Sequence, residues 1–243
     1  MSLFFFTVLF LNPSLAIQGG QSVDSHSPLA AVSVSLGDIS SGKIQNSYCS
    51  GTLVSAHALV TAAHCVLGKN PAEIMVEFGI DATTTTIFRS VTQIVIPQEY
   101  QPYDSQLPKI RDAQDIGIVF FSGELPAGFK PAIMVDTELD QANEGQSFLV
   151  AGFGNPEAGS LHTCATTLLR SNFSRSEFQL FESITCALGT GDSGGAVYQI
   201  QNQTVALFGI HDWGWHDQNG RPAYSVETKL SFYGPWIRTL PLF

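Results

Sequence analysis

The sequence predicts an all-β fold, arranged as one large unit or as two small domains. Its apolar stretches are short, as in residues 28–36, 115–121 and 196–200, and turn-forming glycine and proline are spread along the chain. No internal repeat, heptad or low-complexity tract is visible. With 243 residues, 44% of them hydrophobic and 13% charged, the chain can bury a large core.

The overall charge narrows the classes of partner. The formal net charge is -10 at pH 7. Nucleic acid and anionic membrane surfaces repel an acidic protein, so neither is expected as a partner. Solubility is the simpler interpretation of the charge.

The first 16 residues resemble a secretory signal peptide. An apolar run over residues 3–11 is followed by Ser14-Leu15-Ala16, small residues suited to a cleavage site. The run is too short to span a bilayer, so no stable membrane association is expected once it is removed. No Lys or Arg precedes the run, and a buried N-terminal strand is the alternative.

Residues 48–65 are the first stretch that indicates chemistry. Residues 28–36 alternate between apolar and small polar side chains, as in a half-buried strand. Residues 48–65 then predict a strand, a turn and a second strand that ends at His64. Small neighbours leave His64 room to face a cleft, and Cys65 can bridge back to Cys49 in an exported protein.

An acidic residue enters the apolar strand of residues 115–121. Asp115 would be buried at the base of this strand, and a buried carboxylate needs a partner. We expect it to accept the Nδ1–H of His64 and so fix the tautomer in which Nε2 acts as a base. Asp112 is the competitor for this role, although it lies outside the apolar run.

The segment from Gly189 to Val197 predicts a tight turn that leads into a strand at residues 196–200. Its glycines allow backbone angles that a Cβ would forbid, so the N–H groups of Gly191 and Ser193 can converge on one point. Ser193 is therefore the candidate nucleophile, with Gly191 and Ser193 as oxyanion donors. Taken alone, Ser-Gly-Gly also occurs in ordinary turns.

Together the three stretches resemble the chymotrypsin-like (trypsin-family) serine peptidases. The resemblance rests on Thr61-Ala62-Ala63-His64-Cys65, on Asp115-Ile116 and on Gly191-Asp192-Ser193-Gly194-Gly195. His, Asp and Ser also follow one another in the chain order of that family. The resemblance implies two antiparallel six-stranded β-barrels, an active site between them and a short C-terminal helix.

The resemblance also implies a division of the chain. The signal peptide would cover residues 1–16 and the peptidase domain residues 17–243. Within that domain we expect a first barrel at about 27–121, a linker at about 122–135, a second barrel at about 136–232 and a closing helix at about 235–240.

Ile17-Gln18-Gly19-Gly20 resembles the mature N-terminus of the family, Ile-Val-Gly-Gly. In that family the freed amino group of the isoleucine pairs with the aspartate before the nucleophile, here Asp192. Ala16 stands where the family has a basic residue at its activation site. Our hypothesis is that signal cleavage itself creates the working N-terminus.

The resemblance bears on the four cysteines as well. It pairs Cys49 with Cys65, and the remaining pair, Cys164 and Cys186, would brace the second barrel near the substrate pocket. Two free thiols are the alternative for the second pair. The family's bridge from the serine turn to the far pocket wall is absent.

The pocket floor would be Ala187, six residues before the nucleophile, followed by Leu188. A neutral, apolar floor cannot pair with a guanidinium or ammonium group, so we expect apolar or small side chains at the cleavage site. Trp213 and Gly214 would form the pocket wall, with Trp213 as a shelf for the substrate.

Asp212 falls where the family has a serine that hydrogen-bonds the triad aspartate. Two carboxyl groups that close would raise one pKa. Alternatively Asp212 turns away toward His211, or the register shifts by two so that Gly214 and Trp215 take these places. In a further alternative, His211 or Arg221 lines the pocket and favours an acidic substrate residue.

These patterns predict a secreted serine endopeptidase that acts by acyl transfer on protein or peptide substrates. No cofactor and no metal are implied, and a monomer is expected. The competing hypothesis is a catalytically inactive relative that uses the same fold as a binding protein.

Overall fold

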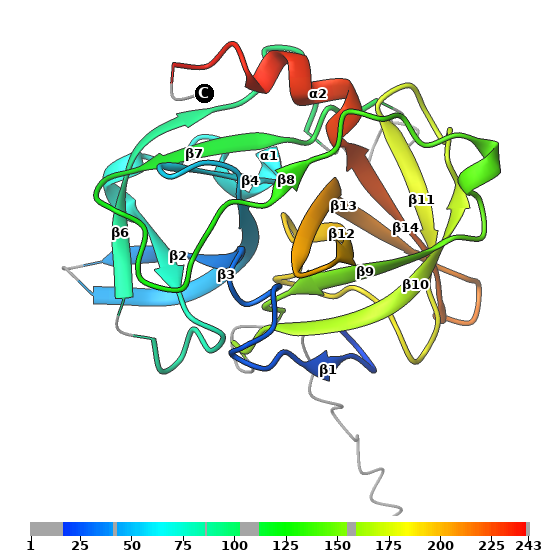
Figure 1. The fold of residues 1–243 in the computed structure, drawn as a ribbon, viewed down its shortest axis with the longest axis horizontal. Helices are drawn as coiled ribbons and strands as arrows, with labels where there is room; N and C mark the ends of the chain where they lie inside the picture. The colour runs from blue at the N-terminus through cyan, green and yellow to red at the C-terminus, as the bar shows by residue number, and fades with distance from the viewer. Residues whose placement is uncertain (1–16, 41–42, 86, 103–111, 155–158, 242–243) are drawn as a thin grey trace, which may run out of the picture.

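The computed structural model describes residues 17–40, 43–85, 87–102, 112–154 and 159–241. The predicted signal peptide, residues 1–16, lies outside these ranges. The described chain forms two β-barrels that lie side by side (Figure 1). This confirms the predicted all-β class.

The first barrel has six antiparallel strands and closes on itself in the order β2-β3-β4-β7-β6-β5. Alternating and β-branched residues form most of these strands, and their inward side chains make an apolar core around Phe78 and Phe121. The strands are β2 (Ser33–Ser40), β3 (Lys43–Leu53), β4 (Ala58–Thr61), β5 (Ile74–Phe78), β6 (Ile87–Val95) and β7 (Gly117–Phe121).

The second barrel repeats this plan. Its strands pair in the cycle β9-β10-β11-β14-β13-β12, and β12 returns to β9. They are β9 (Ser147–Gly152), β10 (His162–Arg170), β11 (Glu177–Phe181), β12 (Ala196–Gln201), β13 (Thr204–His216) and β14 (Pro222–Lys229). The predicted architecture of two six-stranded barrels is therefore confirmed.

Two short strands extend the sheet of the second barrel, and two 3-10 turns lie in the connections between strands. β1 (Gln21–Ser22) pairs with β10, and β8 (Ile133–Met134) runs parallel to β13. The 3-10 turns cover Pro71–Glu73 and Gln141–Asn143. Because β1 follows Ile17 closely, its pairing holds the start of the described chain against the second barrel.

One apolar cluster joins the two barrels. It contains buried residues of both, among them Val60, Ile118, Phe120, Phe153, Tyr198 and Leu207. The Tyr198 hydroxyl, from the second barrel, contacts Thr52 Oγ1 of the first. A shared core of this kind fixes the position of the segment that carries His64 relative to the one that carries Ser193.

The C-terminal helix begins earlier than the sequence suggested. α2 spans Leu230–Ile237, so Pro235 lies inside it and not in its first turn. Leu230, Tyr233 and Ile237 form its buried stripe, and this packing against the shared core extends the helix on the N-terminal side of the proline. The predicted start at about residue 235 was wrong for this reason.

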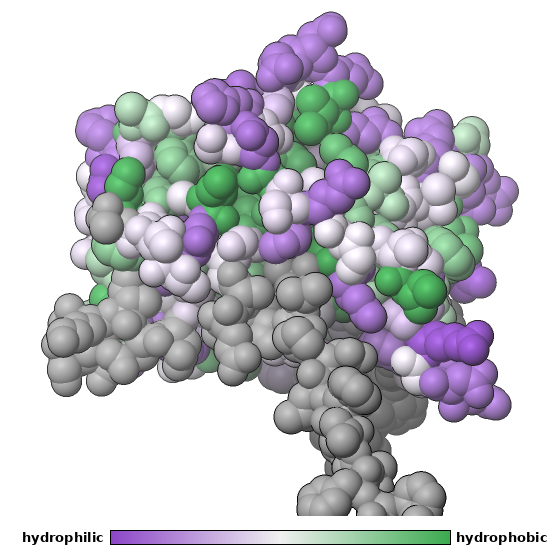
Figure 2. Space-filling view, turned by 90° about the horizontal axis from the view of Figure 1, so that it is seen from below, coloured by the Kyte–Doolittle hydropathy of each residue, from purple (hydrophilic) through white to green (hydrophobic). Residues whose placement is uncertain are grey.

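Exposed apolar residues are few and lie on different elements. The large ones include Ile133, Phe181 and Ile184. Figure 2 shows hydrophilic and hydrophobic residues mixed over the face seen from below, which is ordinary for a protein surface. Among the described residues, no helix has the length and hydropathy needed to cross a membrane.

Candidate active site

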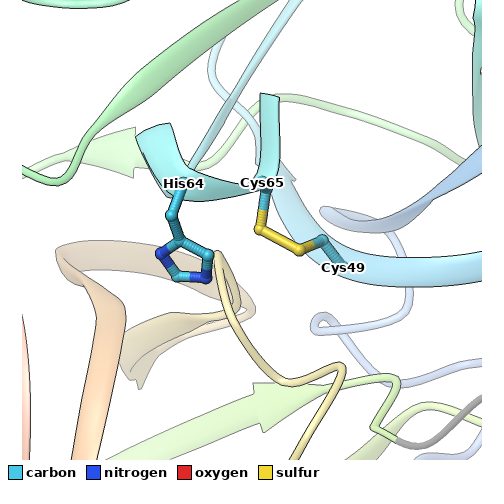
Figure 3. A group of neighbouring side chains, drawn as sticks. All are labelled: Cys49, His64 and Cys65. Atoms are coloured by element: carbon cyan, nitrogen blue, oxygen red, sulfur yellow. A yellow bond between two sulfur atoms is a disulfide. The ribbon is translucent and has the colours of Figure 1, made fainter. Parts of the chain in front are cut away.

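His64 is held at the end of a disulfide-pinned hairpin. β4 runs into the four-residue helix α1 (Ala63–Val66), where Cys65 is bonded to Cys49 of β3. Figure 3 shows the imidazole and the disulfide projecting from this one turn. The neighbours of His64 in α1 are buried, whereas its own side chain is 37% exposed. The imidazole is thus fixed at its root and open to solvent at its tip.

Asp115 lies just before β7 and binds His64 twice. Its Oδ1 accepts the main-chain N–H of His64 at 2.8 Å, and its Oδ2 lies 2.5 Å from His64 Nδ1. Asp115 is only 2% exposed. Burial alone raises its pKa, but the hydrogen bonds from His64 outweigh burial, and the pKa of Asp115 is lowered. The carboxylate therefore stays ionised and orients the imidazole.

Asp112, the alternative to Asp115, is engaged elsewhere. Its carboxylate accepts the main-chain N–H and the hydroxyl of Ser176, both at 3.0 Å. Its own N–H donates to Glu177. Asp112 therefore ties the segment before β7 to the second barrel and leaves His64 to Asp115.

The Ser193 turn lies against the His64 hairpin. Ser50 N donates to the Ser193 carbonyl at 2.8 Å, and Gly194 N donates to the His211 carbonyl at 3.0 Å. Gly194 has a φ of +77°, and a Cβ there would meet Thr61 Oγ1 at 2.0 Å, so only glycine fits. The half-buried Ser193 therefore lies between the first barrel and β13.

Two N–H groups of this turn are available to a ligand. In the described part of the chain, neither Gly191 N nor Ser193 N donates to another backbone group. Gly191 has a φ of +93°, and its carbonyl is held by Ser50 Oγ at 2.9 Å. No hydrogen bond joins Ser193 Oγ to His64 Nε2 among the described residues, and such bonds often tighten only when substrate binds.

The Ile17 nitrogen donates to Asp192 Oδ2 at 3.0 Å. Gly189 N donates to the same oxygen at 2.8 Å, and both Ile17 and Asp192 are 0% exposed. Burial raises the pKa of Asp192 to about 6, although these N–H donors act in the opposite direction. The structure thus brings together the two residues that the sequence paired.

Asp212 faces Asp115 and does not turn away. Carboxyl oxygens of Asp115 and Asp212 lie within 4.8 Å of each other and of a His64 ring nitrogen. Burial and the Asp115 charge raise the pKa of Asp212 well above its usual value. Of the two carboxyls, Asp212 is therefore the one that holds a proton beside the ionised Asp115. This answers the open question about Asp212, and the shifted register is not observed.

The predicted pocket residues gather at one end of the second barrel. Ala187 and Leu188 line a crevice together with Cys186 and Ser225, and β13 carries Trp213 and Gly214 beside them. Trp213 lies edge-on to Phe173 and Tyr224. The Cys164–Cys186 disulfide is formed as predicted, so Cys186 fixes the residue before the pocket floor.

One residue of this crevice was missed by the sequence analysis. Glu182, directly after β11, lines it and is 4% exposed. It belongs to none of the three motifs and stands eleven residues before the nucleophile. The available signal was its position directly after an apolar strand. A carboxyl buried there needs a hydrogen-bond partner, and the sequence alone does not indicate which residue supplies it.

Among the described residues, two groups of side chains place possible metal-ligand atoms within 4.8 Å of one another. The first is Cys49, His64 and Cys65, but both sulfurs are bonded to each other and offer no thiolate. The second is His64, Asp115 and Asp212, of which His64 Nδ1 and Asp115 Oδ2 are already hydrogen-bonded to each other.

The fold and the site define a class. Two six-stranded barrels with His64, Asp115 and Ser193 brought together where they meet are the architecture of chymotrypsin-like serine peptidases and their homologues. A sequence model of the trypsin family, described as Trypsin, matches residues 17–237. The chain belongs to this family.

A solved structure shares the fold. It is the inactivated protease paralogue S-I1 of the scabies mite, which has a TM-score of 0.70 and 21% sequence identity with this chain. The alignment covers 91% of this chain and 97% of the mite protein. At this identity the likeness concerns the fold alone.

Proposed function

We propose that the protein is a secreted serine endopeptidase. The observation that carries the proposal is the pair of hydrogen bonds from His64 to buried Asp115, next to a serine turn whose Gly191 and Ser193 N–H groups are available. An imidazole oriented by a carboxylate can take a proton from a hydroxyl, and two converging donors can hold an oxyanion.

The reaction follows from these positions. Ser193 Oγ attacks the carbonyl carbon of the substrate, and its proton passes to His64 Nε2. The carbonyl oxygen becomes an oxyanion, which the Gly191 and Ser193 N–H groups bind. His64 then gives the proton to the leaving amine, so the C–N bond breaks and an acyl-enzyme remains. Water, deprotonated by His64, releases the acid and restores Ser193.

We propose further that the working chain starts at Ile17. Ile17 has a φ of +33°, which is strained for a β-branched residue inside a continuous chain. A free amino terminus carries no such restriction, and its positive charge would pair with buried Asp192. The signal-like pattern of residues 1–16 and the two disulfides support export and cleavage at this point.

The experiment is the intact mass of the secreted protein before and after a fluorophosphonate, which labels activated serines. We expect a chain that begins at Ile17 and gains one adduct. Ser193→Ala should abolish the adduct, and Ser193→Ala or His64→Ala should lower kcat for a peptide substrate by about 10⁶-fold. Ser25→Ala, at an exposed serine outside the site, is the matched control and should keep both.

An inactive binding protein is the second candidate. It is favoured by the narrowness of the pocket crevice, which as it stands does not admit a water molecule. The same experiment separates the two functions. A folded chain that starts at Ile17 and takes no adduct would overturn the peptidase and support the binding protein.

A further inference from the structure

The carboxyl group of Glu182 stands between two predicted walls of the substrate pocket. Its Oε1 accepts the main-chain N–H of Leu188 at 2.8 Å. Its Oε2 lies 3.4 Å from the point where a Cβ on Gly214 would stand. That second oxygen is buried and has no hydrogen-bond partner among the described residues. The floor of the pocket is therefore a carboxyl group as well as the apolar side chain of Ala187.

The charges around this carboxyl do not balance. Glu182, Asp192 and Glu227 are buried near one another, and His211 is the imidazole that they share. His211 Nδ1 lies 3.4 Å from Glu227 Oε1, and Asp192 pairs with the Ile17 nitrogen. Even with His211 and the Ile17 amino group both charged, three carboxyls face two cations. One counter-charge is missing, and Glu182 is the carboxyl left without one.

The surroundings of Glu182 favour its neutral form. Burial raises the pKa of Glu182, and the hydrogen bond from Leu188 N and the His211 charge only partly offset this effect, while the charges of Glu227 and Asp192 add to it. A positive group that enters the pocket would reverse this effect, since an opposite charge within about 4–6 Å favours the ionised carboxylate.

The narrow crevice discriminates between kinds of substrate side chain. The crevice is too narrow to admit a water molecule, so a side chain that enters it comes into contact with the Glu182 carboxyl that lines it. An apolar side chain would leave the buried Oε2 of that carboxyl without a partner, at a cost of about 1–3 kcal/mol. An ammonium or guanidinium group would give that oxygen a charge-assisted hydrogen bond.

We propose that Glu182 determines substrate specificity by binding the positive side chain of a lysine or arginine whose carbonyl Ser193 attacks. The inference rests on the proposed peptidase function, and it replaces the expectation of apolar side chains drawn from Ala187. An acidic substrate residue is disfavoured, because His211 is already held by Glu227. Arg221 lies in an exposed turn bonded to Asp217.

The test compares matched peptides. Ala-Ala-X p-nitroanilides with X as lysine, norleucine or glutamate differ only in the charge and end group of one side chain. We expect kcat/KM for lysine to exceed that for norleucine by at least about 10²-fold, with glutamate the poorest. Glu182→Gln, which keeps an acceptor for Leu188 N, should bring the lysine and norleucine values within about threefold.

Two controls separate a failed pocket from a failed fold or mechanism. Exposed Glu124→Gln should leave the lysine preference intact. Fluorophosphonate labelling, which does not use the pocket, should proceed equally in Glu182→Gln and in the unaltered protein. Cleavage of the norleucine peptide as fast as the lysine peptide, or an unchanged preference in Glu182→Gln, would overturn the inference.

A binding measurement decides the question if no peptide is cleaved. Calorimetry on the Ser193→Ala protein would compare n-butylammonium, the end of a lysine side chain, with neutral 1-butanol. We expect the ammonium to bind at least about 10-fold more tightly, and the difference to vanish when Glu182→Gln is added. Equal affinity for both probes would reject the role of Glu182 independently of catalysis.

Discussion

The interiors of the two barrels treat charge differently. The first barrel packs an apolar core, and its buried Glu77 accepts hydrogen bonds from the hydroxyl groups of Ser35 and Ser47. The second barrel buries Glu182, Asp192, His211, Asp212 and Glu227 within or beside its active-site end. In the first barrel the buried carboxyl thus lies among hydroxyl partners, although Glu77 Oε1 has no hydrogen-bond partner among the described residues. If the working chain starts at Ile17 and takes a cationic substrate side chain, as proposed, the second barrel receives its counter-charges from these two groups.

The largest expected effect breaks this balance at Asp192. In Asp192→Asn the buried amino group of Ile17 loses its counter-charge, and breaking a buried pair costs about 3–5 kcal/mol. We expect the rate of fluorophosphonate labelling to fall by about 10²-fold or more, because the Ser193 turn is held by this pair. Glu124→Gln, at an exposed carboxyl, is the control. An unaffected rate would show that the turn is ordered without the pair.

A cavity in the first barrel should lower the stability of the fold without abolishing labelling of Ser193. The Phe78 ring packs edge-on against Phe121 and Phe129, with centroids 5.7 and 5.0 Å away. Phe78→Ala should lower the free energy of unfolding by about 3–5 kcal/mol, measured in urea, while the folded fraction still takes the label. The half-buried Phe88 is the matched site, and Phe88→Ala should cost clearly less. Equal losses would contradict the apolar-core account.

The two disulfides allow a direct comparison of the barrels. They close segments with separations of 16 and 22 residues, so removing either pair should cost a similar 2–4 kcal/mol or so. Their functional effects should differ. Loss of Cys49–Cys65 should slow labelling, because it frees the His64 turn. Loss of Cys164–Cys186 should raise KM for peptides, because it frees Ala187. A higher KM on loss of Cys49–Cys65, with slower labelling on loss of Cys164–Cys186, would contradict the positions proposed for His64 and for the pocket floor.

The smallest effect concerns pH and Asp212. Its pKa is raised in the folded protein, so the stability that its proton provides is complete below about pH 4 and is lost as pH rises through the folded pKa. The hydroxyl in Asp212→Ser donates at every pH. The variant should therefore gain stability over the parent, by about 1 kcal/mol, at pH 9 relative to pH 5 in urea unfolding. A difference independent of pH would contradict a protonated Asp212.

Resemblance to a known family was enough to predict some features and not others. The two barrels, the second disulfide and the meeting of Ile17 with Asp192 were predicted because three short motifs resemble those of the trypsin family, and the structure contains all of them. Glu182 carries no such motif. Its role depends on the end of β11 lying beside Leu188 and Gly214, which only the closure of the second barrel brings about.

The start of α2 was also set by tertiary contacts, in this case against a local sequence preference. Pro235 suggested a first turn, since proline is favoured there. Packing of Leu230 and Tyr233 against the shared core outweighs that local preference, so the helix extends through the proline. The orientation of Asp212 was equally open, because both alternatives satisfied the sequence and only the position of Asp115 decides between them.

The buried Ile17 nitrogen has a practical consequence for anyone who produces the protein. If the working chain starts at Ile17, as proposed, a purification tag or a leftover methionine ahead of it would replace the amino group that pairs with Asp192 by an ordinary amide. A preparation made in that way could be folded, disulfide-bonded and silent in every assay. Affinity handles belong at the opposite terminus, beyond α2, and the first residue of the purified chain is worth sequencing before any claim that the protein is inert.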